Sequence, residues 1–162
     1  MKTLVVGLGN PILCDDGVGP QVAEELKVRL DKPEGRLRRP DVTVLETSMA
    51  GLSFLDLLTG YDKVIIVDAI QTEGGRAGQI YKLDPGVLDV TRHTASPHDI
   101  NFATALELGK KLGLALPQQI VVFAVEAADT TTFSERCTPE VSCAIPACVE
   151  MIIQELNTGA DP

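Results

Sequence analysis

The run KVIIVDAI, at positions 63–70, most constrains how this chain can fold. It is apolar at almost every position, whereas a strand with one solvated face alternates apolar and polar residues. Such a run is typical of a strand buried on both faces, as in a parallel sheet covered by helices. Asp68 lies inside this run. A carboxylate there is costly to desolvate unless it faces a polar cleft that holds a cation or a hydrogen-bond donor.

Other apolar, β-rich runs alternate with helical patterns along the chain, which predicts an α/β fold with a doubly wound, mostly parallel sheet of five strands. The predicted strands are Thr3–Leu8, Val42–Glu46, Lys63–Ile70, Gly78–Lys82 and Gln119–Val125. The predicted helices are Val18–Leu30, Leu52–Leu58, His98–Leu112 and Pro139–Leu156. Because the connector QTEGGRAG is short and rich in turn residues, we expect the fourth strand to pair with the third as an antiparallel hairpin.

Length and charge restrict the class of protein further. A chain of 162 residues fits one domain, which we place at residues 1–157, with 158–162 as a flexible tail. A net charge of −9 argues against nucleic acid as a partner, because that binding depends on Lys and Arg. With no apolar run of membrane-spanning length and no export signal, we expect a cytoplasmic protein that does not enter a membrane.

The four cysteines lack the CxxC spacing of zinc sites. They are Cys14, Cys137, Cys143 and Cys148. In a protein that is not secreted, we expect the last three to be small buried hydrophobes. Cys14 adjoins two aspartates, where a thiolate would contact a soft metal, but nearby carboxylates raise a thiol pKa and favour a packing role.

The loop GLGNPILCDDGVG, at positions 7–19, resembles a nucleotide-binding loop, but it places Asp15 and Asp16 where phosphate oxygens would lie. Its glycines allow a tight turn from the first strand into the first helix. One aspartate is expected to cap that helix, a role we assign to Asp15, which leaves Asp16 for a ligand. The residues expected to shape the loop are Gly7, Gly9, Asn10, Asp15, Gly17 and Gly19.

The stretch SPHDI predicts another helix start. Ser96 is a good N-cap, Pro97 suits the first helical position, and Asp99 completes a capping box. His98 therefore lies in the first turn, where the helix dipole favours the neutral ring that can bind a metal. His93 lies in an irregular stretch, and we interpret it as a loop residue or a partner of a metal ligand.

Three polar residues are expected at one edge of the sheet, because the carboxyl ends of parallel strands meet there and ligands bind at that edge. Asp16 follows the first strand, Asp68 lies near the end of the third, and His98 begins a helix after the fourth. Two carboxylates and an imidazole would bind a divalent metal and leave positions open for water or substrate. The structural alternatives are a bond from Asp68 to loop amides and a helix-start role for His98.

Four stretches of the chain together resemble the [NiFe]-hydrogenase maturation endopeptidases. They are VVGLGNPILCDDGVG, VIIVDAI, SPHDINFATAL and TFSERCTPEVSCAIP. The resemblance runs from Leu4 to about Ile153. It implies a three-layer α/β/α sandwich and an enzyme that removes the C-terminal extension of a hydrogenase large-subunit precursor after nickel insertion.

The resemblance also assigns roles to residues. The family's three metal-contacting positions fall on Asp16, Asp68 and His98, and the nickel is expected to arrive with the precursor, although other divalent metals can occupy such a site. The first position is a Glu in some members, so Asp16 is one methylene shorter. The stretch VEAADTTTFSER departs from the Pro- and Gly-containing version of several members. Nothing in the sequence requires more than a monomer.

The mechanism stays open at this stage. The metal can polarise the scissile carbonyl or activate a bound water, or it can anchor the substrate while Asp16 or Asp68 acts as general base. A maturation chaperone that binds the nickel-loaded precursor without cutting it would use the same residues.

Two unrelated alternatives fit less well. In a dinucleotide-binding domain Glu46 would bind the ribose, but Ile12 replaces the third glycine of the fingerprint. A peptidyl-tRNA hydrolase needs a histidine where Pro20 stands, together with a basic face.

Overall fold

The computed structural model describes residues 1–32, 39–49, 51–87 and 102–158. The strands are β1 (Thr3–Leu8), β2 (Val42–Thr47), β3 (Lys63–Ile70), β4 (Ile80–Leu83) and β5 (Gln119–Glu126). The α-helices are α1 (Val18–Leu30), α2 (Gly51–Leu58), α4 (Phe102–Lys111) and α5 (Pro139–Thr158). Short 3₁₀ turns are η1 (Cys14–Gly17) and η2 (Pro85–Val87).

The five strands form one sheet in the order β2-β1-β3-β5-β4. β1, β2, β3 and β5 run parallel, and β4 runs antiparallel to β5. The antiparallel direction expected of β4 is confirmed, but its expected hairpin with β3 is wrong. Both edges of β3 are already paired, with β1 and β5, so β4 adds to the outer edge of β5, where Ile80 pairs with Val125.

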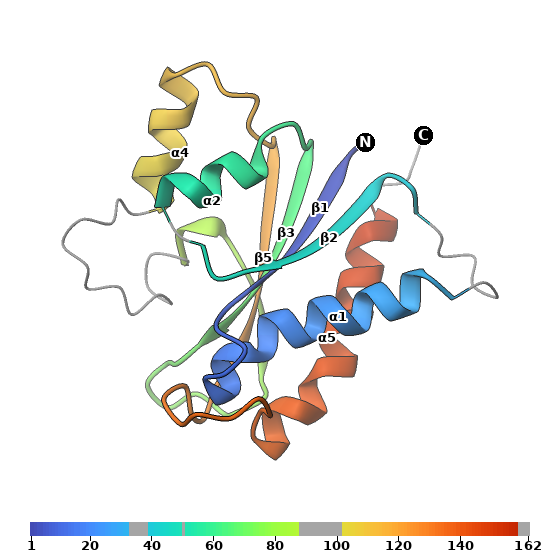
Figure 1. Ribbon diagram of the computed structural model, residues 1–162, viewed down its shortest axis with the longest axis vertical. Helices are drawn as coiled ribbons and strands as arrows, with labels where there is room; N and C mark the ends of the chain where they lie inside the picture. Colours follow the sequence, from blue (N-terminus) through green and yellow to red (C-terminus); the bar gives the residue numbers. More distant parts are fainter. Residues whose placement is uncertain (33–38, 50, 88–101, 159–162) are drawn as a thin grey trace.

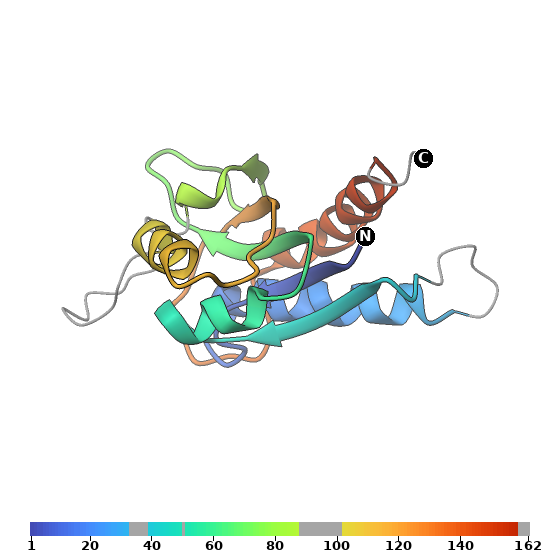
Figure 2. The same cartoon turned by 90° about the horizontal axis from the view of Figure 1, so that it is seen from above.

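Helices cover both faces of the sheet, as the three-layer prediction requires. Helices α1 and α5 lie side by side on one face, and α2 and α4 on the other (Figures 1 and 2). The continuous apolar strands supply both layers, because successive side chains point to opposite faces. In β3, Ile65 and Val67 pack beneath α1 and α5, whereas Val64 and Ile66 pack beneath α2 and α4.

Most element boundaries agree with the sequence pattern. β1, β3 and α1 have the predicted ends, while α5 continues to Thr158 and β5 extends to Glu126. The helix predicted from His98 is seen as α4 from Phe102 onward, and its predicted cap lies outside the described residues.

One expectation about the cysteines is wrong. Cys14, Cys137 and Cys148 are buried and free, but Cys143 is free and exposed. The buried face of the amphipathic helix α5 includes Val141, Ala144 and Cys148. Cys143 lies outside this face.

The strand order reverses at β1. The chain passes from β1 through α1 to β2 on one side, and then through α2 to β3 on the other. In such sheets ligands bind beyond the carboxyl ends of the strands at this reversal. The loop that contains η1 leaves β1 at this edge, and the connections after β3 and β5 also begin there. None of the helices in the described ranges is both long and apolar enough to span a bilayer.

Candidate active site

The glycine loop brings the start of α1 directly against the ends of β1 and β3. A Cβ at Gly7 would collide with the Gly19 carbonyl, and a Cβ at Gly19 would collide with the Leu8 and Val67 carbonyl oxygens. Gly9 has a φ of 142°, which is unfavourable for other residues. Close backbone approach thus explains the glycines, and the loop is the tight turn that the sequence predicts.

Asp16 lies in η1 and is partly exposed. Its Oδ2 accepts a hydrogen bond of 2.8 Å from the Asn10 N–H. The Asn10 side-chain oxygen in turn accepts one of 3.2 Å from the Ile12 N–H. The loop therefore fixes the orientation of the Asp16 carboxylate from one side and leaves part of its surface open to solvent.

Asp15 does not cap α1, which corrects the expected role. The N-cap of α1 is Gly17, and no side chain caps this helix. The Asp15 side chain is fully buried. Its carboxylate accepts hydrogen bonds from the N–H groups of Ala128, Asp129 and Thr138 at 2.9, 3.0 and 2.7 Å. Asp15 lies within η1, two residues before the N-cap Gly17, and its carboxylate bonds to the connection between β5 and α5 instead.

Asp68 is buried near the carboxyl end of β3, with 5% of its surface exposed. Its Oδ1 accepts a hydrogen bond of 2.9 Å from the Ala69 N–H. Because Val67 packs beneath α1 and α5, strand alternation places Asp68 on the face covered by α2 and α4. On that face the buried ring of Phe102, the first residue of α4, lies 5.6 Å from that of Phe54.

Two of the three predicted metal ligands can be placed. Asp16 in η1 and Asp68 in β3 belong to elements that contact each other at the carboxyl edge of the sheet. His98 and His93 lie outside the described residues. Within the described part of the chain, no three His, Cys, Asp or Glu side chains group closely enough to hold a metal ion. The three-residue site therefore stays a prediction.

The buried thiols suit packing rather than metal binding. Burial, reinforced by the Asp15 charge, raises the pKa of Cys14. Burial raises the pKa of Cys137 to about 11, with the Asp15 charge again contributing, and that of Cys148 to about 12. Protonated thiols are poor metal ligands, which agrees with the packing role expected for Cys14.

A third buried carboxylate at this edge, after those of Asp15 and Asp68, belongs to Glu126, the last residue of β5. Its Oε1 accepts hydrogen bonds from the N–H and hydroxyl of Thr72, at 2.8 and 2.7 Å. Its Oε2 is buried and has no hydrogen-bond partner among the described residues. The sequence pattern predicted that this strand ends at Val125. A charged residue that closes the apolar run QIVVFAVE is the same kind of signal that identified Asp68.

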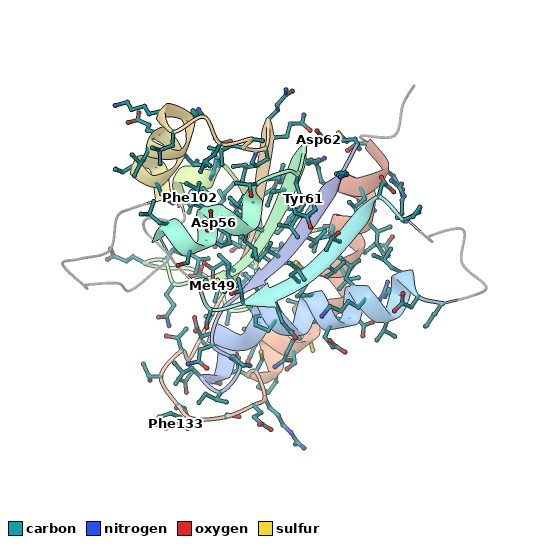
Figure 3. The ribbon with its side chains drawn as sticks, turned by 45° about the horizontal axis from the view of Figure 1, so that its top comes forward. Met49, Asp56, Tyr61, Asp62, Phe102 and Phe133 are labelled. Carbon is teal, nitrogen blue, oxygen red and sulfur yellow. The ribbon has the colours of Figure 1, made fainter. Side chains whose placement is uncertain are left out.

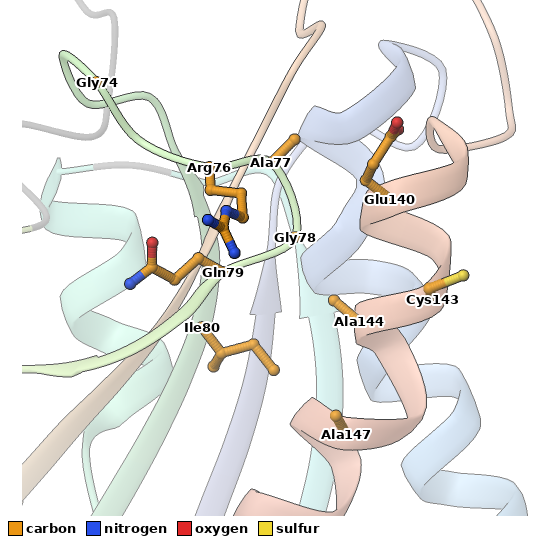
Figure 4. Close-up of a pocket in the computed structure, with 10 residues that line it drawn as sticks. All are labelled: Gly74, Arg76, Ala77, Gly78, Gln79, Ile80, Glu140, Cys143, Ala144 and Ala147. Carbon is orange, nitrogen blue, oxygen red and sulfur yellow. The ribbon is translucent and has the colours of Figure 1, made fainter.

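A groove of about 800 Å³ lies between α5 and the segment that leads from β3 into β4 (Figure 4). Arg76 and Gln79 line one side, and Glu140 and Cys143 line the other. Neither Asp16 nor Asp68 lines it. The groove is thus separate from the two predicted metal ligands that the structure describes.

The fold and this edge define a class of protein. A doubly wound α/β domain with carboxylates beyond its parallel strands binds its ligand at that edge. Residues 20–155 match the family model described as hydrogenase maturation protease. The chain belongs to this family, and it is a hydrolase of the peptidase class.

Individual relatives agree with this assignment. The hydrogenase 2 maturation protease of Escherichia coli is 27% identical over 97% of this chain and 92% of its own length. The crystal structure of a [NiFe] hydrogenase maturation protease from Thermococcus kodakarensis has a TM-score of 0.68, with 27% identity over 96% of this chain and 92% of the other.

A further structure supports the fold. The E. coli hydrogenase maturating endopeptidase has a TM-score of 0.78 and 24% identity, over 99% of this chain and 94% of the other. The α/β fold with its mostly parallel five-stranded sheet is therefore confirmed. The dinucleotide-binding and peptidyl-tRNA hydrolase alternatives fall away because the chain matches the maturation protease family model.

Proposed function

We propose that this protein is an endopeptidase that removes the C-terminal extension of a [NiFe]-hydrogenase large-subunit precursor after nickel insertion, acting in the cytoplasm as a monomer. One observation carries the proposal: in a chain of the maturation protease family, Asp16 and Asp68 lie on touching elements at the ligand-binding edge of the sheet. His98 is the proposed third contact.

Electrostatics supports a nickel-loaded substrate. Two carboxylates gathered at one edge repel each other, and a divalent centre carried by the precursor would relieve this repulsion, whereas a nickel-free precursor would not. The buried Asp68 supplies a fixed contact, and the partly exposed Asp16 supplies one that an incoming protein can reach. Recognition of the metal would then also ensure that only a precursor that already contains nickel is cleaved.

Two routes to hydrolysis fit these residues. The nickel centre can polarise the scissile carbonyl or lower the pKa of a bound water. Alternatively it only anchors the substrate, and Asp16 or Asp68 takes a proton from the attacking water. The second route would make cleavage depend on a carboxylate even when the precursor is firmly bound.

The decisive experiment compares nickel-loaded and nickel-free precursor as substrates, with mass spectrometry of the released peptide. We expect the wild-type protein to shorten only the loaded form. Asp16→Asn and His98→Ala should each lower the cleavage rate by at least about a hundredfold, the scale expected for a positioned acid–base or metal contact. Asp56→Asn changes an exposed carboxylate on α2 and should leave the rate unchanged.

Each contrary result has a distinct meaning. Equal cutting of both precursor forms would overturn the metal-recognition proposal. Tight binding of the loaded precursor without a released peptide would show a chaperone instead of a protease.

A further inference from the structure

The connection between β5 and α5 is bound along its length to the loop that carries Asp16. The Asp15 N–H donates to the Asp129 carbonyl, and the Cys14 N–H donates to the Ser134 carbonyl, both at 2.9 Å. The Ser134 N–H returns a bond of 3.0 Å to the Ile12 carbonyl. The buried Asp15 carboxylate joins the two loops a second time. They therefore form one unit, in which residues 129–134 have a fixed position relative to Asp16.

This connection is also stiffened from within. The Asp129 carboxylate accepts hydrogen bonds from the N–H groups of Thr131 and Thr132, both at 3.0 Å, and from the Thr132 hydroxyl at 2.5 Å. The Ser134 hydroxyl accepts a bond of 3.1 Å from the Arg136 N–H. A loop held in this way loses little conformational freedom when it binds a partner.

The residue at the centre of this stiff loop is an exposed aromatic. Phe133 has 81% of its surface exposed, the most among the exposed large apolar residues of the described chain. Ile12, whose carbonyl accepts the bond from the residue after Phe133, is 47% exposed. Figure 3 shows Phe133 projecting from the end of the molecule opposite Asp62. We call Phe133 and Ile12 the apolar prong.

Two further exposed apolar side chains follow a strand toward the ligand-binding edge. Met49, which follows β2, and Leu52, in the first turn of α2, are also exposed large apolar residues. Both follow a strand at its carboxyl end, as do Ile12 and Phe133. A single exposed apolar side chain is ordinary, but several around a binding site mark an interaction surface.

We propose that the apolar prong docks into an apolar recess on the hydrogenase large-subunit precursor, beside the segment that is presented to Asp16. The inference rests on the proposed function, because the occupant is the substrate of that same site. It commits to this partner because the prong is joined to the Asp16 loop by main-chain hydrogen bonds, so a protein that reaches Asp16 also meets Phe133. An aromatic side chain on a backbone that is already held by hydrogen bonds docks with little loss of backbone entropy, and aromatic residues are enriched at interfaces.

The test measures both the Kd of the nickel-loaded precursor and its cleavage kinetics for wild type, Phe133→Ala and the control Leu112→Ala. Leu112 is 66% exposed and follows α4 at the amino edge of the sheet, away from Asp16. Phe133→Ala should weaken binding by at least about tenfold, raise KM and preserve kcat, which is the pattern for a lost docking contact. Leu112→Ala should match wild type in both measurements. Because both side chains are exposed, thermal unfolding should be unchanged in each variant.

Failure of the docking inference and failure of the proposed function give different results. If Phe133→Ala binds and cleaves the precursor as wild type does, the docking inference is overturned and the protease proposal stands. If the wild-type protein neither binds nor shortens the precursor, both are overturned.

Discussion

Asp15 and Asp16 are adjacent, identical residues with opposite environments. Asp15 is fully buried and joined to three backbone N–H groups, whereas Asp16 is partly exposed and accepts one from Asn10. A buried carboxylate that is satisfied in this way organises the fold. Asp16, by contrast, retains the access that a ligand needs. The structural and the functional carboxylate of this loop can therefore be separated by mutation.

Asp15→Asn should lower the free energy of unfolding by about 2 to 3 kcal/mol, the usual cost of disrupting buried hydrogen bonds to a charged group. The amide nitrogen would face a backbone N–H that now finds no acceptor. Urea unfolding measures the change. Asp16→Asn is the matched control, because its amide oxygen can still accept the Asn10 N–H, and we expect a loss below about 0.5 kcal/mol. Equal losses in the two variants would contradict this division of roles.

The sequence alone predicted that Asp68 lies within a buried strand, but it did not predict the role of Asp15, and the reason is physical. A charge within an apolar strand is visible locally, because its burial follows from its neighbours. The partners of Asp15, such as Ala128 and Thr138, follow it by more than a hundred residues and become neighbours only in the fold. Glu126 carried the same local signal as Asp68 but ended its strand, where predicted boundaries are least reliable.

At the scale of elements, the β5–α5 connection is ordered by its own polar side chains. Asp129 accepts a side-chain bond from the Thr132 hydroxyl and backbone bonds from Thr132 and Thr131, and these lower the pKa of Asp129 from 3.8 to about 2. The lowered pKa means that the folded loop prefers the ionised carboxylate. The order of the loop is thus linked to pH.

Asp129 should stabilise the protein above about pH 4, and this contribution should disappear as the pH falls toward 2. The sign follows from linkage: a group whose folded pKa is depressed stabilises the fold above its unfolded pKa and ceases to do so as it protonates in the folded state. Unfolding free energies of wild type and Asp129→Asn, measured from pH 2 to 6, should converge at the acid end. A constant difference across this range would contradict the assignment.

The continuous apolar elements were also the most predictable ones. β1, β3 and α1 match their predicted bounds, because burial on both faces, or along one stripe, leaves a clear periodicity. The strand partner of β4 was predicted wrongly because a short connector indicates proximity but does not show which sheet edge is free. The partner of β4 depends on which edge the other strands leave unpaired, and that follows only from the complete strand order.

For the whole molecule, helices close both faces of the sheet around two apolar layers. The chain also carries a net charge of −9, which opposes self-association. The apolar prong is small compared with the roughly 800 Å² per partner of a stable interface, so on its own it does not account for a dimer. These features favour a monomer that associates only with its substrate.

Light scattering after size exclusion should accordingly give 17.3 kDa for the free protein at micromolar concentration. Nickel salt alone should not change this mass, because two carboxylates and an imidazole on one chain make a site that needs no second copy. Mixing with nickel-loaded precursor should produce a one-to-one complex. A dimer of the free protein that Phe133→Ala converts to monomer would show that the prong binds a second copy of this chain, and the docking inference would then fail. A mass of 17.3 kDa for both wild type and Phe133→Ala leaves the prong available for the precursor.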